Sequence, residues 1–150
     1  MSWESRLLLI AEDSEDDYFL LERAFRKANF SNPVRRVKDG QDAIEYLSGA
    51  SPYSDRTAYP LPYLLLLDLK LPIKHGFDVL EWIRHRDEVK VLPVVVFSSS
   101  QQSADIQKSY ELGANGFVAK STSVESLIDV VGAIRDYWLK VNWTDVETKI

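Results

Sequence analysis

The stretch Tyr63-Leu-Leu-Leu-Leu-Asp68-Leu-Lys-Leu-Pro72 decides how the rest of the chain is interpreted. Four consecutive leucines between turn-forming residues are typical of a strand that is buried on both faces of a parallel sheet. A carboxylate at the end of such a strand, Asp68, adds nothing to an apolar core. It is placed where a side chain can take part in chemistry at the edge of the sheet.

Further strand-like segments alternate with helical segments along the chain. Strands are predicted over residues 6–11, 33–37, 64–67, 93–97 and 116–119. Helices are predicted from Ser14 to Asn29, around residues 43–49, after Gly76, over residues 104–112, and from a capping box of Thr122 and Glu125 onward. Residues 49–62, with their prolines and tyrosines, predict an exposed loop. The alternation predicts one α/β domain with an open, doubly wound parallel sheet.

Composition narrows the classes of function. The chain of 150 residues is 45% hydrophobic and 27% charged, as in soluble globular domains. A net charge of -5 disfavours nucleic-acid binding, and no apolar run approaches the roughly 20 residues that cross a bilayer. The absence of cysteine excludes disulfides and thiolate metal sites and favours a reducing compartment. We therefore expect a cytoplasmic protein without nucleic-acid or membrane partners.

Polar groups follow four of the five predicted strands. They are Asp13, Asp68, Ser98 and Lys120. Because parallel strands end at the same edge of a sheet, we expect these groups to face one pocket. Ser99 and Ser100 remain alternatives to Ser98, Asp68 could merely cap the turn that follows it, and Lys120 could be an ordinary surface lysine.

With Glu12, which precedes Asp13, three carboxylates lie at these strand ends, and Glu12, Asp13 and Asp68 would repel one another unless a cation lay among them. Oxygen ligands without histidine or cysteine suit Mg²⁺. With Lys120 and Ser98 as donors to an anion, the set suits a phosphoryl group in transfer, and a carboxylate can itself accept that group. The neighbouring acidic residues 15–17 are interpreted as a solvated helix start that favours the helix dipole.

Taken together, these residues resemble the receiver domain of bacterial two-component response regulators over residues 6–139. The resemblance is carried by Glu12-Asp13, Asp68 with Pro72, Gly76, Ser98 and Lys120, in this order. It implies a flavodoxin-like, CheY-like (βα)5 fold with strand order 2-1-3-4-5. It also implies a receiver domain over residues 1–140 and a short tail over residues 141–150, with no separate output domain.

In that family the aspartate matched by Asp68 accepts a phosphoryl group from a phosphohistidine of a sensor kinase. The resemblance implies that Asp13, Asp68 and the backbone carbonyl of Lys70 ligate Mg²⁺ (or Mn²⁺), with Glu12 acting through water. The side chain of Lys70 could also pair with Asp68 or Glu12 and slow the loss of phosphate. The protein would then be a phosphoacceptor that catalyses only its own phosphorylation and dephosphorylation.

The resemblance gives Ser98 and Lys120 the role of binding phosphoryl oxygens, and Phe117 that of an aromatic switch residue. Ser121 departs from the family pattern, because most receivers follow this lysine with proline in a cis peptide. A cis bond without proline costs about 2.5–4 kcal/mol, so we expect a trans or a strained Lys120–Ser121 bond and a shifted turn.

More narrowly, the acidic run 12–17, the stretch 65–72 and the turn 120–123 resemble cyanobacterial phytochrome-partnered regulators. This implies a light-sensing histidine kinase as partner. Signals would pass through the surface of the fourth helix, fifth strand and fifth helix, with homodimerisation there. The expected apolar contributors are Ile106, Tyr110, Phe117, Trp138 and Trp143. Alternatively, Trp138 packs within its own domain and the tail folds back on it.

Two other functions compete with a phosphorylation switch. A pseudo-receiver would use the same fold as a constitutive protein-binding module, although the retained acidic and lysine residues count against it. A nucleotide-binding oxidoreductase or a phosphatase ranks third, and no glycine-rich fingerprint for a dinucleotide follows the first strand.

Overall fold

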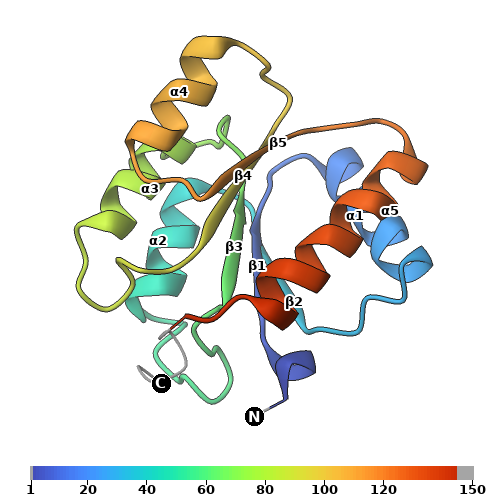
Figure 1. Cartoon of the computed structure of the whole chain (residues 1–150). Helices are drawn as coiled ribbons and strands as arrows, with labels where there is room; N and C mark the ends of the chain where they lie inside the picture. Colours follow the sequence, from blue (N-terminus) through green and yellow to red (C-terminus); the bar gives the residue numbers. More distant parts are fainter. Residues whose placement is uncertain (1, 145–150) are drawn as a thin grey trace.

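The computed structural model describes residues 2–144, which form one parallel sheet covered by helices on both faces (Figure 1). The strands are β1 (Leu8–Ala11), β2 (Val34–Val37), β3 (Leu64–Leu67), β4 (Val94–Ser98) and β5 (Gly116–Ala119). The helices are α1 (Glu15–Lys27), α2 (Gly40–Ser48), α3 (Gly76–Arg84), α4 (Ser103–Glu111) and α5 (Val124–Ala133). A 3₁₀ turn η1 (Trp3–Ser5) precedes β1, and a π-helical segment η2 (Ile134–Val141) continues α5. The strand order β2-β1-β3-β4-β5 confirms the predicted fold.

The leucine run of β3 supplies both hydrophobic cores. Leu65 and Leu67 pack in the core that includes α2 and α3, whereas Leu64 and Leu66 pack in the core of α1 and α5. All four side chains are buried, because helices cover both faces of the sheet (Figure 1). Successive side chains of a strand point to opposite faces, so an unbroken apolar run is what a doubly covered strand requires.

The helix starts follow local hydrogen-bonding chemistry. Ser14 caps α1, since its hydroxyl accepts a hydrogen bond of 3.2 Å from the Asp17 N–H, as the sequence predicted. The predicted cap of α5 is wrong by one residue. The capping hydroxyl belongs to Ser123, which accepts from the Ser126 N–H at 3.3 Å. The Ser123 hydroxyl in turn donates to Glu125, so the neighbouring Thr122 has no capping role.

The loop over residues 49–62 is less exposed than predicted. Tyr53 and Tyr59 pack against the buried ring of Tyr46 on α2, with ring centroids 4.9 and 6.1 Å from it. The Tyr46 hydroxyl donates a hydrogen bond of 2.8 Å to the Pro60 carbonyl. The aromatic rings therefore fold the loop back over the end of α2 and extend the core.

The predicted tail begins inside the described part of the chain and continues beyond it. Its last described residues are held by the Tyr63 hydroxyl, which donates to the Asn142 carbonyl at 2.9 Å and accepts from the Thr144 N–H at 3.2 Å. Residues 145–150 of the predicted tail lie outside the described residues. Within residues 2–144, no helix has the length and apolar character needed to cross a membrane.

Candidate functional site

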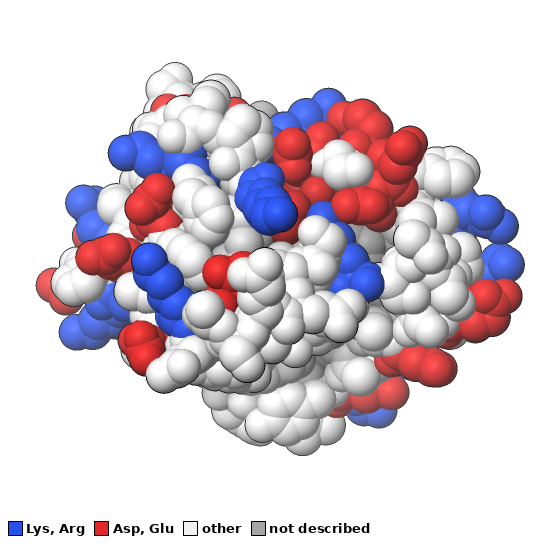
Figure 2. All heavy atoms as spheres, turned by 90° about the horizontal axis from the view of Figure 1, so that it is seen from above, with Lys and Arg blue, Asp and Glu red and all other residues white. Residues whose placement is uncertain are grey.

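The carboxyl ends of the parallel strands form the edge of the sheet where the sequence predicted a pocket. Figure 2 looks down on this edge and shows acidic side chains gathered over the start of α1, with basic side chains beside them. Glu12 and Asp13 follow β1, Asp68 follows β3 and Lys120 follows β5. Residues far apart in the sequence are thus brought to one surface by the parallel arrangement of the strands.

Lys120 is the centre of this group. Its Nζ lies 2.7 Å from Asp17 Oδ2, 2.8 Å from Glu12 Oε1 and 3.0 Å from Asp68 Oδ2. The backbone fixes where the side chain starts, because the Lys120 N–H donates to the Ser98 carbonyl at 2.8 Å. The structure therefore brings together Glu12, Asp68 and Lys120, which the sequence had grouped, and adds Asp17.

The interpretation of residues 15–17 as a solvated helix start is wrong for Asp17. One helical turn carries its carboxylate toward the end of β5, where it meets Lys120. Arg36 was also missed by the sequence reasoning. Its guanidinium donates to the Glu12 carbonyl at 2.9 Å and to Glu15 Oε2 at 3.1 Å, which ties the acidic loop to β2. Its position at the end of the edge strand, opposite the acidic run, was the only sequence signal.

Burial and charge act in opposite directions on the two buried members of the cluster. Burial raises the pKa of Glu12 from 4.5 to about 7, against the contact with the Lys120 ammonium, which lowers it. For Lys120, burial lowers the pKa, but the hydrogen bond to Asp17 and the contacts with Glu12 and Asp68 together raise it above its ordinary value. The ammonium is therefore charged near neutral pH, while a proton or a further cation can stabilise the excess negative charge.

The donor set fits a divalent cation. Carboxylate oxygens of Glu12, Asp13 and Asp68 all lie within 4.8 Å of one another. Around Mg²⁺, with Mg–O distances of about 2.1 Å, opposite ligands lie about 4.2 Å apart, so small side-chain adjustments suffice. The buried Glu12 Oε1 is in ion-pair contact with Lys120 but receives no well-aligned hydrogen bond. This leaves it able to face a cation, directly or through water.

The remaining predicted site residues are placed as follows. Ser98 is fully buried, and its hydroxyl accepts a hydrogen bond of 3.1 Å from the Ser100 N–H. Phe117 is half-buried and packs against the core of α2 and α3. Among residues 2–144 the cis peptide is Ser51–Pro52, so the Lys120–Ser121 bond is trans. The Lys70 side chain is exposed, and no ion pair with Asp68 or Glu12 is found among the described residues.

Gly76, another member of the matched motif, holds the loop after β3 in place. Its N–H donates to the Leu69 carbonyl at 2.7 Å. A Cβ at this position would collide with the Asp68 carbonyl oxygen and would lie 2.7 Å from the Leu69 Cα. Both are backbone atoms and cannot move aside cheaply, so glycine is required for the loop that presents Asp68.

Two other hollows lie away from this edge. One of about 400 Å³ lies between β5, α5 and the end of α4, and Tyr110, Phe117 and Trp138 are among its lining residues. Ile106 and Trp143, predicted for the same surface, are not part of that lining.

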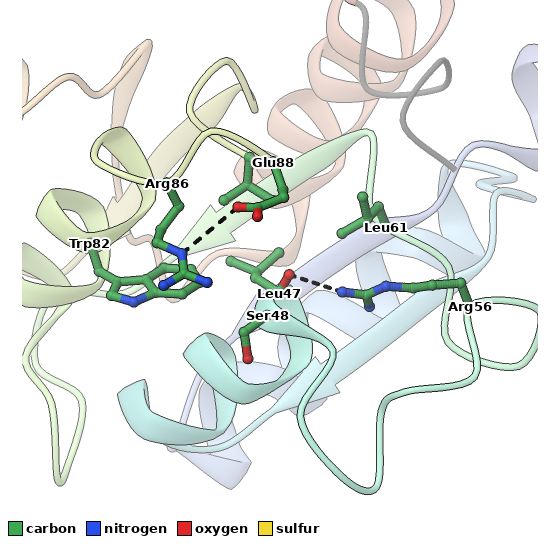
Figure 3. A pocket seen from close by; sticks show the side chains of 8 residues that line it. Leu47, Ser48, Arg56, Leu61, Trp82, Arg86 and Glu88 are labelled. Atoms are coloured by element: carbon green, nitrogen blue, oxygen red, sulfur yellow. Dashed lines mark hydrogen bonds and ion pairs between the residues drawn. The ribbon is translucent and has the colours of Figure 1, made fainter.

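The second hollow, of about 220 Å³, lies near the amino end of β3 (Figure 3). There Arg86 faces Glu88 at 3.8 Å, and Arg56 donates to the Leu47 carbonyl at 2.9 Å. Its charged groups thus interact with groups around the hollow itself, and it contains none of the predicted site residues.

Comparisons with known proteins agree with this geometry. Residues 8–132 match the response regulator receiver domain. Response regulator Rcp1 of Synechocystis sp. (strain ATCC 27184 / PCC 6803 / Kazusa) is 33% identical over 135 residues, which cover 90% of this chain and 90% of Rcp1. The probable methanogenesis regulatory protein FilR2 of Methanothrix harundinacea (strain 6Ac) is 32% identical over 136 residues, covering 91% of this chain and 85% of FilR2.

Solved structures resemble the whole domain. The phosphorylated cyanobacterial phytochrome response regulator RcpA has a TM-score of 0.84 at 33% identity, covering 93% of this chain and 97% of RcpA. The Mn(2+)-bound form of Rcp1 has a TM-score of 0.81 at 32% identity, covering 92% of this chain and 97% of Rcp1.

Proposed function

The chain belongs to the response regulator receiver family, and we propose that Asp68 accepts a phosphoryl group from a sensor histidine kinase in a Mg²⁺-dependent reaction. The observation that carries this proposal is the contact of 3.0 Å between Lys120 Nζ and Asp68 Oδ2 at the end of β3. A buried carboxylate beside an ammonium and two further carboxylates combines a nucleophile with groups that stabilise an anion and hold a cation.

In the proposed transfer a carboxylate oxygen of Asp68 attacks the phosphorus of the phosphohistidine. A P–O bond forms as the P–N bond breaks, and the imidazole leaves with a proton from the medium. The Lys120 ammonium donates hydrogen bonds to the phosphoryl oxygens. Asp13, Asp68 and the Lys70 carbonyl would hold Mg²⁺, with Glu12 acting through water, and the bound cation would supply positive charge beside the transferred group.

The proposed consequence of phosphorylation is a change in the packing of side chains at the surface around β5. The phosphoryl group carries about −1.5 to −2 charges, in place of the single charge of the Asp68 carboxylate. In the proposed switch the Ser98 hydroxyl leaves the Ser100 N–H, which it contacts at 3.1 Å, to meet the phosphoryl group. Phe117, which is half-buried beside the hollow at β5, then changes its packing. The signal is passed on by protein–protein contact at that surface.

Intact mass measurement tests the acceptor. The wild type and Asp68→Asn are incubated with Mg²⁺ and a small acyl-phosphate donor. A phosphoryl adduct on the wild type alone is the expected result. No adduct at any Mg²⁺ concentration would favour the second candidate, a constitutive protein-binding module with a receiver fold.

We propose further that the kinase is a phytochrome, which is supported by the likeness to RcpA, a cyanobacterial phytochrome response regulator. FilR2, named as a methanogenesis regulator, is matched about as well, so the kinase must be tested directly. In the same mass assay, a phosphorylated phytochrome kinase should transfer to Asp68 faster than a phosphorylated histidine kinase of another class. Equal rates would reject the phytochrome partner.

We also propose a homodimer through α4, β5 and α5. Tyr110 is 50% exposed there, and Trp138 and Phe117 line the hollow of about 400 Å³. Exposed apolar side chains around a hollow are typical of a protein interface. Analytical ultracentrifugation should show a dimer that is strengthened by a phosphoryl mimic. A monomer at high concentration, with and without the mimic, would remove this proposal.

A further inference from the structure

Asp17 makes the shortest contact to the lysine of the site, although it is not among the predicted site residues. Its Oδ2 accepts a hydrogen bond of 2.7 Å from Lys120 Nζ. The residue lies in the first turn of α1, and its own N–H is held by the Ser14 hydroxyl. The carboxylate is therefore presented from a fixed backbone, and not from a mobile loop.

Asp17 differs from the other two carboxylates that contact Lys120. Its side chain is 37% exposed, against 1% for Glu12 and 6% for Asp68, so it lies at the mouth of the site. Glu12 and Asp68 belong to the cluster that could hold a cation, together with Asp13, and Asp17 does not. The Lys120 ammonium thus contacts two candidate metal ligands, Glu12 and Asp68, and one carboxylate outside the candidate metal cluster, Asp17.

We infer that Asp17 is a positioning residue that holds the Lys120 ammonium from the mouth of the site, so that a cation can replace the ammonium at the candidate metal ligands. An ammonium has three donors and is an internal competitor of any divalent cation. Without Asp17, its strong partners would be Glu12 and Asp68 alone, and a cation would have to displace it from both. With Asp17, Lys120 keeps a charged partner when the cation takes those ligands.

The same contact keeps Lys120 where an arriving phosphoryl group would meet it, and this part of the inference rests on the proposed function. Two donors of the ammonium become available to the phosphoryl oxygens, while the third stays on Asp17. Asp17 touches neither the acceptor nor the candidate metal ligands in any contact found among residues 2–144. It acts through Lys120.

Asp16 offers a matched control. It is the neighbouring residue on the same turn of α1, carries the same charge and is exposed. Asp16→Asn removes one negative charge near the site without removing the contact to Lys120. If Asp17 acted only through its charge, Asp16→Asn and Asp17→Asn would weaken cation binding to the same extent.

Calorimetric titration with Mg²⁺ tests the inference without any phosphoryl transfer. We expect Asp17→Asn to raise the Kd for Mg²⁺ about fivefold to tenfold, the size of one partly exposed charge-assisted hydrogen bond, and Asp16→Asn less than about twofold. Asp17→Glu should restore most of the affinity. In a Lys120→Gln background the two asparagine variants should be equal, since the residue through which Asp17 acts is gone.

Equal Kd values for Asp17→Asn and Asp16→Asn in the presence of Lys120 would overturn the inference, as would an Asp17 effect that persists in Lys120→Gln. The result is separable from the proposed function. A specific Asp17 effect on Mg²⁺ binding in a protein that accepts no phosphoryl group would refute the function and leave the cation-binding role of Asp17 standing. Phosphorylation of the wild type, together with equal Kd values for Asp17→Asn and Asp16→Asn, would support the proposed function and refute the cation-binding role of Asp17.

Discussion

Each end of the sheet holds a partly buried cation, Arg56 at the amino end and Lys120 at the carboxyl end, and the two differ in what surrounds them. At the amino end, the half-buried Arg56 donates to the carbonyls of Tyr46 and Tyr59 at 2.8 and 3.2 Å, and to that of Leu47 at 2.9 Å (Figure 3). At the carboxyl end, Lys120 contacts three carboxylates at 2.7 to 3.0 Å. The three neutral carbonyls hold the guanidinium by hydrogen bonds and bring no negative charge that a further cation could neutralise. Three carboxylates around one ammonium leave negative charge that a further cation can neutralise.

Arg56 and Lys120 therefore have different roles. The carbonyls of Tyr46 and Leu47 belong to the last turn of α2, where the regular hydrogen bonds of a helix run out. Arg56 donates to both of them, in addition to the Gly49 N–H at 3.3 Å from the Tyr46 carbonyl, and its charge favours the helix dipole. Burial lowers the pKa of Arg56, whereas the carboxylate partners raise that of Lys120. The amino end stabilises the fold, and the carboxyl end holds charges ready to be rearranged.

Exchanging each cation for methionine should separate stability from reaction. We expect Lys120→Met to slow formation of the Asp68 adduct about 100-fold, because an anion-stabilising donor is lost. Arg56→Met should leave that rate unchanged but lower the free energy of unfolding by about 3 kcal/mol, because the buried carbonyls around it lose their donor. Mass measurement and urea denaturation give the two quantities.

Arg86→Met is the control for the stability arm. Arg86 lines the same hollow but is exposed, and it lies 3.8 Å from the exposed Glu88. Its loss should change the free energy of unfolding by less than about 0.5 kcal/mol. If Arg56→Met slowed phosphorylation as much as Lys120→Met does, the two ends would be coupled and the division of roles would be wrong.

The sequence predicted the parts of this comparison that depend on order along the chain. Asp68 and Lys120 each follow an apolar strand, and parallel strands must end at one edge, so their meeting required no further knowledge. Asp17 could not be assigned in the same way, because its contact depends on how α1 is rotated against the end of β5. Arg56 returns to α2 only because tyrosine rings fold the loop back, and such packing has no local sequence period.

The α5 cap illustrates a smaller limit. Thr122 and Ser123 both carry hydroxyls and both precede the apolar face of the helix, so either could be the N-cap by residue type. The structure selects Ser123, whose hydroxyl reaches the Ser126 N–H. The hydrophobic pattern predicts that a helix is present. Which of two adjacent hydroxyl residues caps that helix depends on the backbone geometry, which the pattern does not show.

A further expected effect concerns the pH dependence of stability, to which Glu12 at the carboxyl end should contribute and Arg56 at the amino end should not. Burial raises the pKa of Glu12 from 4.5 to about 7 in the folded protein. Between these values the folded state binds more protons than the unfolded state, so the free energy of unfolding falls as pH rises. No titration of Arg56 falls in this range, because a guanidinium stays charged far above it.

Comparison of the wild type with Glu12→Gln isolates this contribution, since other groups that titrate in the same range are common to both proteins. In a metal-chelating buffer, the free energy of unfolding of the wild type relative to Glu12→Gln should fall by about 2 kcal/mol between about pH 5.5 and about pH 7.5. The loss caused by Arg56→Met should be constant over that range. A flat difference for Glu12→Gln would show that the buried carboxylate is already neutralised by Lys120, whose Nζ lies 2.8 Å from it, and that the carboxyl end carries no excess charge.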